Sequence, residues 1–148
     1  MRWSKVRSLV KERFAPELVG RLDINSTTYG NSSMGHAWLT WDGEVIAYFC
    51  TNSYGMIGGF YRQEKPPPRI DPGGPLARYG EFTREDAYDA CWAYLHDLSI
   101  EEALTDNDPL VNALALADAR VGKRRLKQLT PERYHPLAAQ IISLRQSA

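Results

Sequence analysis

Five cationic residues fall within eight consecutive positions of the chain and form its most distinctive chemical feature. They are Arg120, Lys123, Arg124, Arg125 and Lys127. Lysine and arginine side chains at this density can neutralise phosphate groups, either of a nucleic acid or of a smaller ligand, with release of bound counterions. We call these five residues the basic cluster and treat it as a candidate site for phosphate or nucleic-acid binding.

The basic cluster also has a purely structural interpretation. Residues 81–108 contain nine Asp and Glu residues against a single Arg, and helices of opposite charge can pair inside one domain. Arg120 and Arg124 are spaced to share one helix face, so they can pair with the acidic helices. On this interpretation Lys123 and Lys127 stay solvated. Because the formal net charge of the chain is zero, we favour the structural role over phosphate binding.

A second candidate site is aromatic. Trp38 and Trp41 lie three positions apart on a predicted strand, so their side chains are expected on opposite faces of the sheet, one under a helix and one exposed. The loop that follows adds Tyr54, Phe60 and Tyr61. Exposed aromatic side chains beside a loop are typical of a protein-binding surface. The alternative is that a helix covers the tryptophan and that the loop glycines serve only the backbone.

The chain carries no recognisable catalytic, metal or nucleotide motif. Gly122-Lys123 lacks the upstream glycine and the following Ser or Thr of a P-loop. The three histidines show no paired ligand spacing, and Cys91 falls on an apolar helical stripe, as expected of a core thiol. We therefore predict no metal, no cofactor and no catalytic residue. The leading hypothesis is a non-catalytic protein-binding protein, the alternative is nucleic-acid or phosphate binding through the basic cluster, and an enzyme of unknown type ranks third.

The elements that position these residues follow from hydrophobic periodicity. Apolar spacing predicts an amphipathic helix over residues 3–14, and alternation predicts a strand over residues 21–29. Two runs rich in aromatic and β-branched residues flank Asp42-Gly43, which predicts a β-hairpin. The Gly- and Pro-rich residues 51–80 are expected to form a long loop with one edge strand near residues 56–61. The predicted fold is α+β, with the N-terminal helix packed on a small antiparallel meander and a helical C-terminal half.

Helix start signals divide that C-terminal half into several helices. Ser99 followed by Glu102 predicts a capping box, and Asp108-Pro109 predicts the start of an apolar helix that continues as far as Val121. Thr130-Pro131 predicts the start of the last helix. A buried stripe is also expected at Tyr88, Cys91, Trp92, Leu95 and Leu98.

Length and composition favour a single domain. At 148 residues, with 43% hydrophobic and 24% charged residues, the chain fits one globular domain over residues 1–148. Its parts are a helix plus meander over residues 1–50, the loop over 51–80 and a helical half over 81–148. Cys50 and Cys91 are far apart without a secretory signal, as is typical of reduced thiols in a cytoplasmic protein. No window of about 18 apolar residues exists, so no membrane span is expected.

Four stretches of the chain carry a resemblance to a known family. They are MRWSKVRSLVKERF, GHAWLTWDG, GEFTREDAYDACWAYLHDLSIEEAL and DPLVNALALADARVGKRRL. Together they resemble a family of small uncharacterised bacterial proteins with a domain of unknown function, over most of the chain outside Ser53–Arg78. That family brings no established activity, so the resemblance implies no functional residue.

Overall fold

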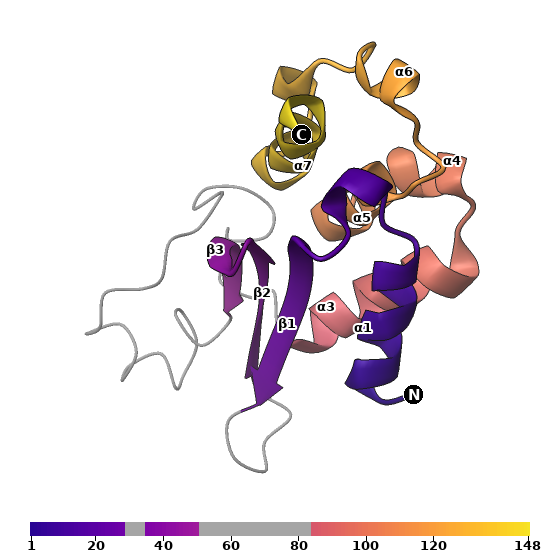
Figure 1. Cartoon of the computed structure of the whole chain (residues 1–148). Coiled ribbons are helices and arrows are strands. Elements are labelled where there is room, and N and C mark those ends of the chain that lie inside the picture. Colours follow the sequence, from indigo (N-terminus) through magenta and orange to yellow (C-terminus); the bar gives the residue numbers. More distant parts are fainter. Residues whose placement is uncertain (29–34, 51–83) are drawn as a thin grey trace. The chain divides into compact units, whose positions relative to one another are not determined.

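The computed structural model describes residues 1–28, 35–50 and 84–148, and its ribbon is shown in Figure 1. It contains an N-terminal helix, a three-stranded antiparallel sheet and then a helical C-terminal half, which confirms the predicted α+β class. The chain divides into two compact units. One unit contains Met1–Gly20 and Tyr88–Ala148, and the other contains Arg21–Ala87. The predicted edge strand near residues 56–61 lies outside the described residues.

The sheet consists of three strands that follow one another in the chain. They are β1 (Leu22–Thr28), β2 (Gly35–Trp41) and β3 (Glu44–Cys50), paired in the order β1-β2-β3 (Figure 1). The turn between β2 and β3 has positive φ at both central residues, 51° at Asp42 and 85° at Gly43. These values match the turn that an Asp-Gly pair favours, so the predicted hairpin is confirmed.

One face of the sheet is buried. The register places Leu22 opposite Trp41 and Ile24 opposite Leu39, and residues paired in this way point to the same face. Leu22, Ile24 and Leu39 are all buried, together with Ala37 and Ala47. The β2–β3 register shifts directly after Leu39, as in a β-bulge.

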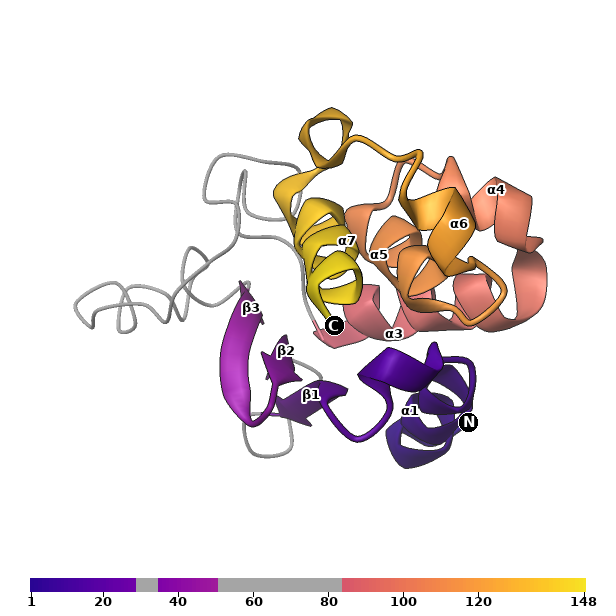
Figure 2. The ribbon, with the colours of Figure 1, turned by 45° about the horizontal axis from the view of Figure 1, so that its top comes forward.

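The remaining elements are helical. They are α1 (Trp3–Glu12), a 3-10 turn (Pro16–Leu18), α3 (Arg84–Trp92), a π turn (Ala93–Asp97), α4 (Ile100–Leu104), α5 (Pro109–Ala117), α6 (Lys123–Leu126), a second 3-10 turn (Pro131–Arg133) and α7 (Pro136–Ser147). Helix α5 packs against α4 and α7 (Figure 2), and all nine of its residues are buried. Because it is buried on every side, with Asn112 as its one polar residue, α5 forms the centre of the core of its unit.

Two of the predicted helix starts are confirmed. The Ser99 hydroxyl accepts a hydrogen bond from the backbone N–H of Glu102 at 3.1 Å, and the Glu102 carboxylate accepts one from the N–H of Ser99 at 3.3 Å. This reciprocal pair is the capping box of α4. Asp108 caps α5 by accepting from the N–H of Leu110 at 2.8 Å, with Pro109 in the first helical position.

The predicted start of the last helix is wrong. Thr130-Pro131 begins only a 3-10 turn, and α7 begins five residues later. Its N-cap is His135, whose Nδ1 accepts a hydrogen bond from the backbone N–H of Leu137 at 3.1 Å. Pro136 then occupies the first helical position, so the same Xaa-Pro signal that appears at residue 131 is used at residue 136.

The predicted end of the apolar helix at Val121 is also wrong, because α5 ends at Ala117. Asp118 is extended and forms an antiparallel bridge with Phe14. The backbone N–H of Ala15 donates to the carbonyl of Ala117, and the N–H of Ala119 donates to the carbonyl of Arg13, each at 2.8 Å. This short β-like contact with the segment after α1 replaces the hydrogen bonds that would continue the helix.

The π turn changes which residues are buried after α3. The backbone N–H of Leu98 donates to the carbonyl of Ala93, five residues earlier, at 3.0 Å. A π turn holds more residues than an α turn, so it rotates the following side chains and buries Tyr94. Of the predicted stripe, Cys91 and Leu95 are buried, whereas Tyr88, Trp92 and Leu98 are half-buried.

Replacing Ser99 with alanine is expected to destabilise the protein by about 1 kcal/mol, because the cap of α4 loses its acceptor. The free energy of unfolding from urea denaturation measures the effect. Ser8→Ala is the matched control, since Ser8 is exposed within α1 and alanine is the better helix former there. Equal free energies of unfolding for the two variants would show that the capping box does not stabilise the folded protein.

Candidate functional site

The basic cluster does not lie on one helix. Arg120 precedes Gly122, which is the N-cap of α6, and α6 itself is a single turn over Lys123–Leu126. The expectation that Arg120 and Arg124 share a helix face is therefore wrong. Helix α5 ends at Ala117, so Arg120 and Arg124 do not belong to one continuous helix and cannot share a helix face.

Arg120 pairs with Asp118, two residues earlier in the chain, rather than with an acidic helix. Its Nε donates to Oδ1 of Asp118 at 3.0 Å and its Nη2 donates to Oδ2 at 2.7 Å. The hydroxyl of Tyr94 donates to the same carboxylate. Burial acts to raise the pKa of Asp118, but the hydrogen bonds from Arg120 and Tyr94 outweigh it, so the pKa lies below its ordinary value.

Arg125 is the member of the cluster that reaches an acidic helix. Its Nη1 and Nη2 donate to the two carboxylate oxygens of Glu101 at 2.7 and 2.8 Å. This bidentate pair links α6 to α4 on the protein surface. Pairing with the acidic helix was expected of Arg124, whereas in the described part of the chain Arg124 is exposed and forms no ion pair.

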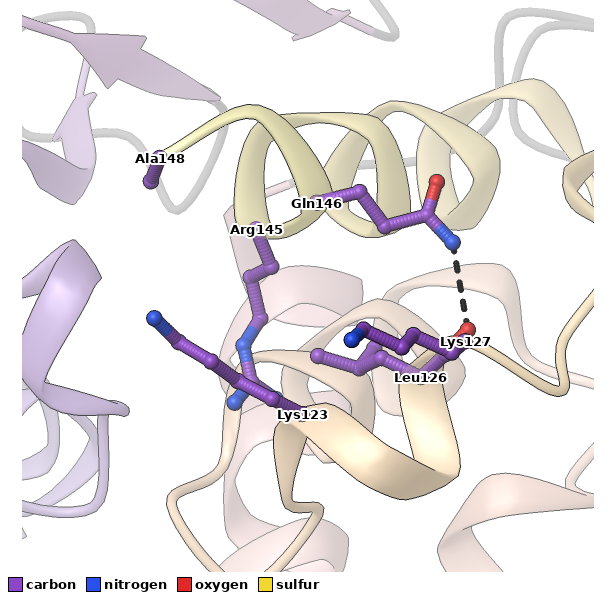
Figure 3. A pocket seen from close by; sticks show the side chains of 6 residues that line it. All are labelled: Lys123, Leu126, Lys127, Arg145, Gln146 and Ala148. Carbon is purple, nitrogen blue, oxygen red and sulfur yellow. Dashed lines mark hydrogen bonds between the residues drawn. The ribbon is translucent and has the colours of Figure 1, made fainter.

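The remaining lysines of the cluster line a pocket. Lys123 of α6 and Lys127, the C-cap of α6, are exposed. Their side chains border a pocket of about 320 Å³ between α6 and α7 (Figure 3). Among the residues that the structure describes, the lining consists of Lys123, Leu126, Lys127, Arg145, Gln146 and Ala148. Three of these six side chains are cationic, so the pocket is built to attract an anion.

Arg145 is the buried cation of the pocket, with a side chain that is only 2% exposed. Its Nε donates to Glu17 at 2.8 Å, and its Nη1 donates to the carbonyl oxygens of Leu116 at 2.8 Å and Asp118 at 3.3 Å. Glu17 and two backbone carbonyls therefore fix the guanidinium of Arg145, which places a positive charge at the wall of the pocket.

Glu17 adds a negative charge next to these cations. Partial burial acts to raise the pKa of Glu17, but the hydrogen bond from Arg145 and the positive charges of Arg145 and Lys123 outweigh it and lower the pKa. Arg145 consequently contacts Glu17 and also lines the pocket.

Gln146 links the two helices that form the pocket, α6 and α7, by a hydrogen bond. Its Nε2 donates to the backbone carbonyl of Leu126 at 3.1 Å, which is the dashed contact in Figure 3. Leu126 is buried beneath the pocket. This bond holds α7 against α6, so the shape of the pocket is defined before any ligand enters.

The aromatic candidate site is described only in part. Trp41 pairs in register with Leu22 and Trp38 pairs with Asn25, which places the two rings on opposite sheet faces as expected. The guanidinium of Arg21 lies 4.2 Å from the centre of the Trp41 ring. Tyr54, Phe60 and Tyr61 lie outside the described residues. The protein-binding surface therefore stays a prediction.

Sequence reasoning missed Arg145, Gln146 and Glu17. One signal for Arg145 was present, because it continues the helical spacing of the buried residues Ile141 and Ile142. A cation at a core position requires buried partners. Glu17 gave no such signal, since it lies 128 positions away from Arg145 in the sequence.

The described residues contain no group of three or more His, Cys, Asp or Glu side chains that could hold a metal ion. Cys91 is buried, and this burial raises the pKa of its thiol to about 12, so it stays protonated at neutral pH. The side chain of Cys50 lies outside the described residues. Among the helices that the structure describes, none is both long and apolar enough to cross a membrane.

Comparison with known proteins identifies the family. The chain belongs to the SF0329 protein family, whose model matches residues 2–146. No curated protein matches the chain. No solved structure matches it either.

Proposed function

In this member of the SF0329 protein family, we propose that the pocket between α6 and α7 binds the phosphate group of a small ligand. The observation that carries the proposal is the convergence of Lys123, Lys127 and the buried Arg145 on one pocket of about 320 Å³. Arg145 supplies a fixed positive charge, and the two exposed lysines supply further positive charge on flexible side chains.

The volume of the pocket supports a small ligand. It falls at the lower end of the range of about 300–1,000 Å³ that is usual for small-molecule sites. Among the described residues of the lining there is no aromatic side chain on which a base could stack. A compact phosphorylated molecule fits this chemistry better than a nucleotide recognised through its base.

The ion pairs of the basic cluster argue against a nucleic acid as the source of the phosphate. Arg120 and Arg125 are paired with Asp118 and Glu101, so the charges of two of the five cations are already partly neutralised. Nucleic-acid binding depends on the number of phosphates that a protein neutralises, and the formal net charge of the chain is zero. We therefore assign the phosphate chemistry of the cluster to the pocket.

Titration with inorganic phosphate in a calorimeter, at low salt and in a buffer free of other polyanions, tests the proposal. Saturable binding by the full chain is expected. The double variant Lys123→Gln/Lys127→Gln is expected to bind at least about tenfold more weakly, because two charges that border the ligand are lost.

The matched control is Arg124→Gln, which removes an exposed cation of the cluster that does not line the pocket. This variant is expected to bind phosphate as the unmodified chain does. Equal losses in the control and in the double variant would indicate diffuse attraction to the surface and overturn the proposal. Binding of a single-stranded oligonucleotide with a steep salt dependence, and no saturable binding of phosphate, would assign the cluster to nucleic acid instead.

A further inference from the structure

Among the residues that the structure describes, Glu17 is the carboxylate that pairs with the buried cation of the pocket, Arg145. It belongs to the 3-10 turn Pro16–Leu18, and its side chain is only 11% exposed. Its Oε1 accepts the hydrogen bond from Nε of Arg145 at 2.8 Å. Glu17 does not line the pocket itself. It therefore acts on the pocket through Arg145 and through its charge.

We infer that Glu17 is an internal counter-anion that competes with the bound phosphate for Arg145 and so limits the affinity of the pocket for phosphate. This inference rests on the proposed function of the pocket. It makes Glu17 a residue that sets affinity without lining the pocket.

The charges near the pocket support the inference. Three cations line it, and Glu17 neutralises part of their field because its carboxylate is paired with Arg145 at 2.8 Å. A phosphate beside the same cations repels this carboxylate across a partly buried medium, where charge interactions are stronger than in bulk water. Removal of the negative charge from Glu17 is therefore expected to tighten phosphate binding.

The burial of Arg145 provides an independent argument. A buried guanidinium is costly unless an opposite charge accompanies it. In the variant Glu17→Gln the amide oxygen can still accept from Nε of Arg145, but the counter-charge is gone. A phosphate in the pocket can then supply the missing negative charge, so the ligand should stabilise this variant more than it stabilises the unmodified chain.

The experiment compares phosphate binding by the unmodified chain, Glu17→Gln and Glu12→Gln. Glu12 is an exposed residue of α1, so its variant makes the same change of charge away from Arg145. Glu17→Gln is expected to bind about tenfold more tightly, the effect of one screened charge interaction. Glu12→Gln is expected to bind as the unmodified chain does. Thermal unfolding with and without phosphate should show the larger stabilisation in Glu17→Gln.

The possible results separate the two proposals. If the unmodified chain binds phosphate and Glu17→Gln binds equally or more weakly, the inference about Glu17 is wrong and the proposed function stands. If none of the three proteins binds phosphate, the proposed function itself is overturned. If Glu17→Gln is unfolded in buffer without phosphate, added phosphate is expected to restore folding, and the absence of such rescue would contradict the inference.

Discussion

Replacement of Arg145 by methionine is expected to destabilise the protein by about 4 kcal/mol, because it removes one partner of a buried ion pair. The side chains of Arg145 and Glu17 are only 2% and 11% exposed, so Glu17 is left with a charge that water reaches poorly. The carbonyl oxygen of Leu116 loses its hydrogen bond from the guanidinium as well. Methionine retains much of the length of the side chain, so the measured cost reports the lost polar contacts more than a lost volume.

Urea denaturation of Arg145→Met and of the control Arg124→Met measures this difference. Arg124 is exposed, and its replacement is expected to change stability by less than about 0.5 kcal/mol. The double variant Glu17→Leu/Arg145→Met is expected to recover much of the lost stability, since it leaves no unpaired buried charge. A cost below about 1 kcal/mol for Arg145→Met would show that the Glu17–Arg145 pair does not hold the two segments together.

The second large effect is expected at Asp118, where replacement by asparagine should cost about 3 kcal/mol. The side chain of Asp118 is only 2% exposed and accepts charge-assisted hydrogen bonds from Arg120 and Tyr94. Asparagine keeps one acceptor but loses the negative charge, and its amide group meets donors instead of acceptors. Tyr94→Phe removes only one of these hydrogen bonds and is expected to cost about 1 kcal/mol.

The stability contributed by Asp118 should depend on pH. Because the pKa of Asp118 is lower in the folded state than its ordinary value, the contribution is fully present above the unfolded pKa of about 4. It is lost as the pH falls through the lower folded pKa. The difference in unfolding free energy between the unmodified chain and Asp118→Asn should therefore shrink between pH 5 and pH 2. A difference that stays constant over this range would contradict the ionised state of Asp118.

The sequence correctly predicted the elements whose geometry depends only on residues that are neighbours in the chain. The hairpin needs only the positive φ values of Asp42 and Gly43, and the cap of α4 needs only Ser99 and Glu102. In these cases every atom that decides the structure belongs to residues that are close together in the chain.

Two of the errors arose where distant segments decide the structure. The helix expected to reach Val121 ends at Ala117 because Asp118 bridges to Phe14, and no local residue signals that partner. The sequence identified the basic cluster as a group. Which of its members pair with acidic residues and which line the pocket depends on tertiary contacts. Arg125 reaches Glu101, whereas Lys123 and Lys127 join Arg145 at a pocket that only the packing of α6 against α7 creates.

The Glu17–Arg145 pair has a consequence for the order of events during synthesis. The chain emerges from the ribosome with Glu17 first, whereas Arg145 follows 128 residues later. The unit that contains Met1–Gly20 is completed by Tyr88–Ala148, so its first segment must wait for nearly the whole chain. The hairpin of β2 and β3 closes over neighbouring residues and can form as soon as it has left the exit tunnel. Residues 1–20 are therefore made well before residues 88–148 but reach their native contacts only after them, and until then α1 exposes its apolar face to chaperones and proteases.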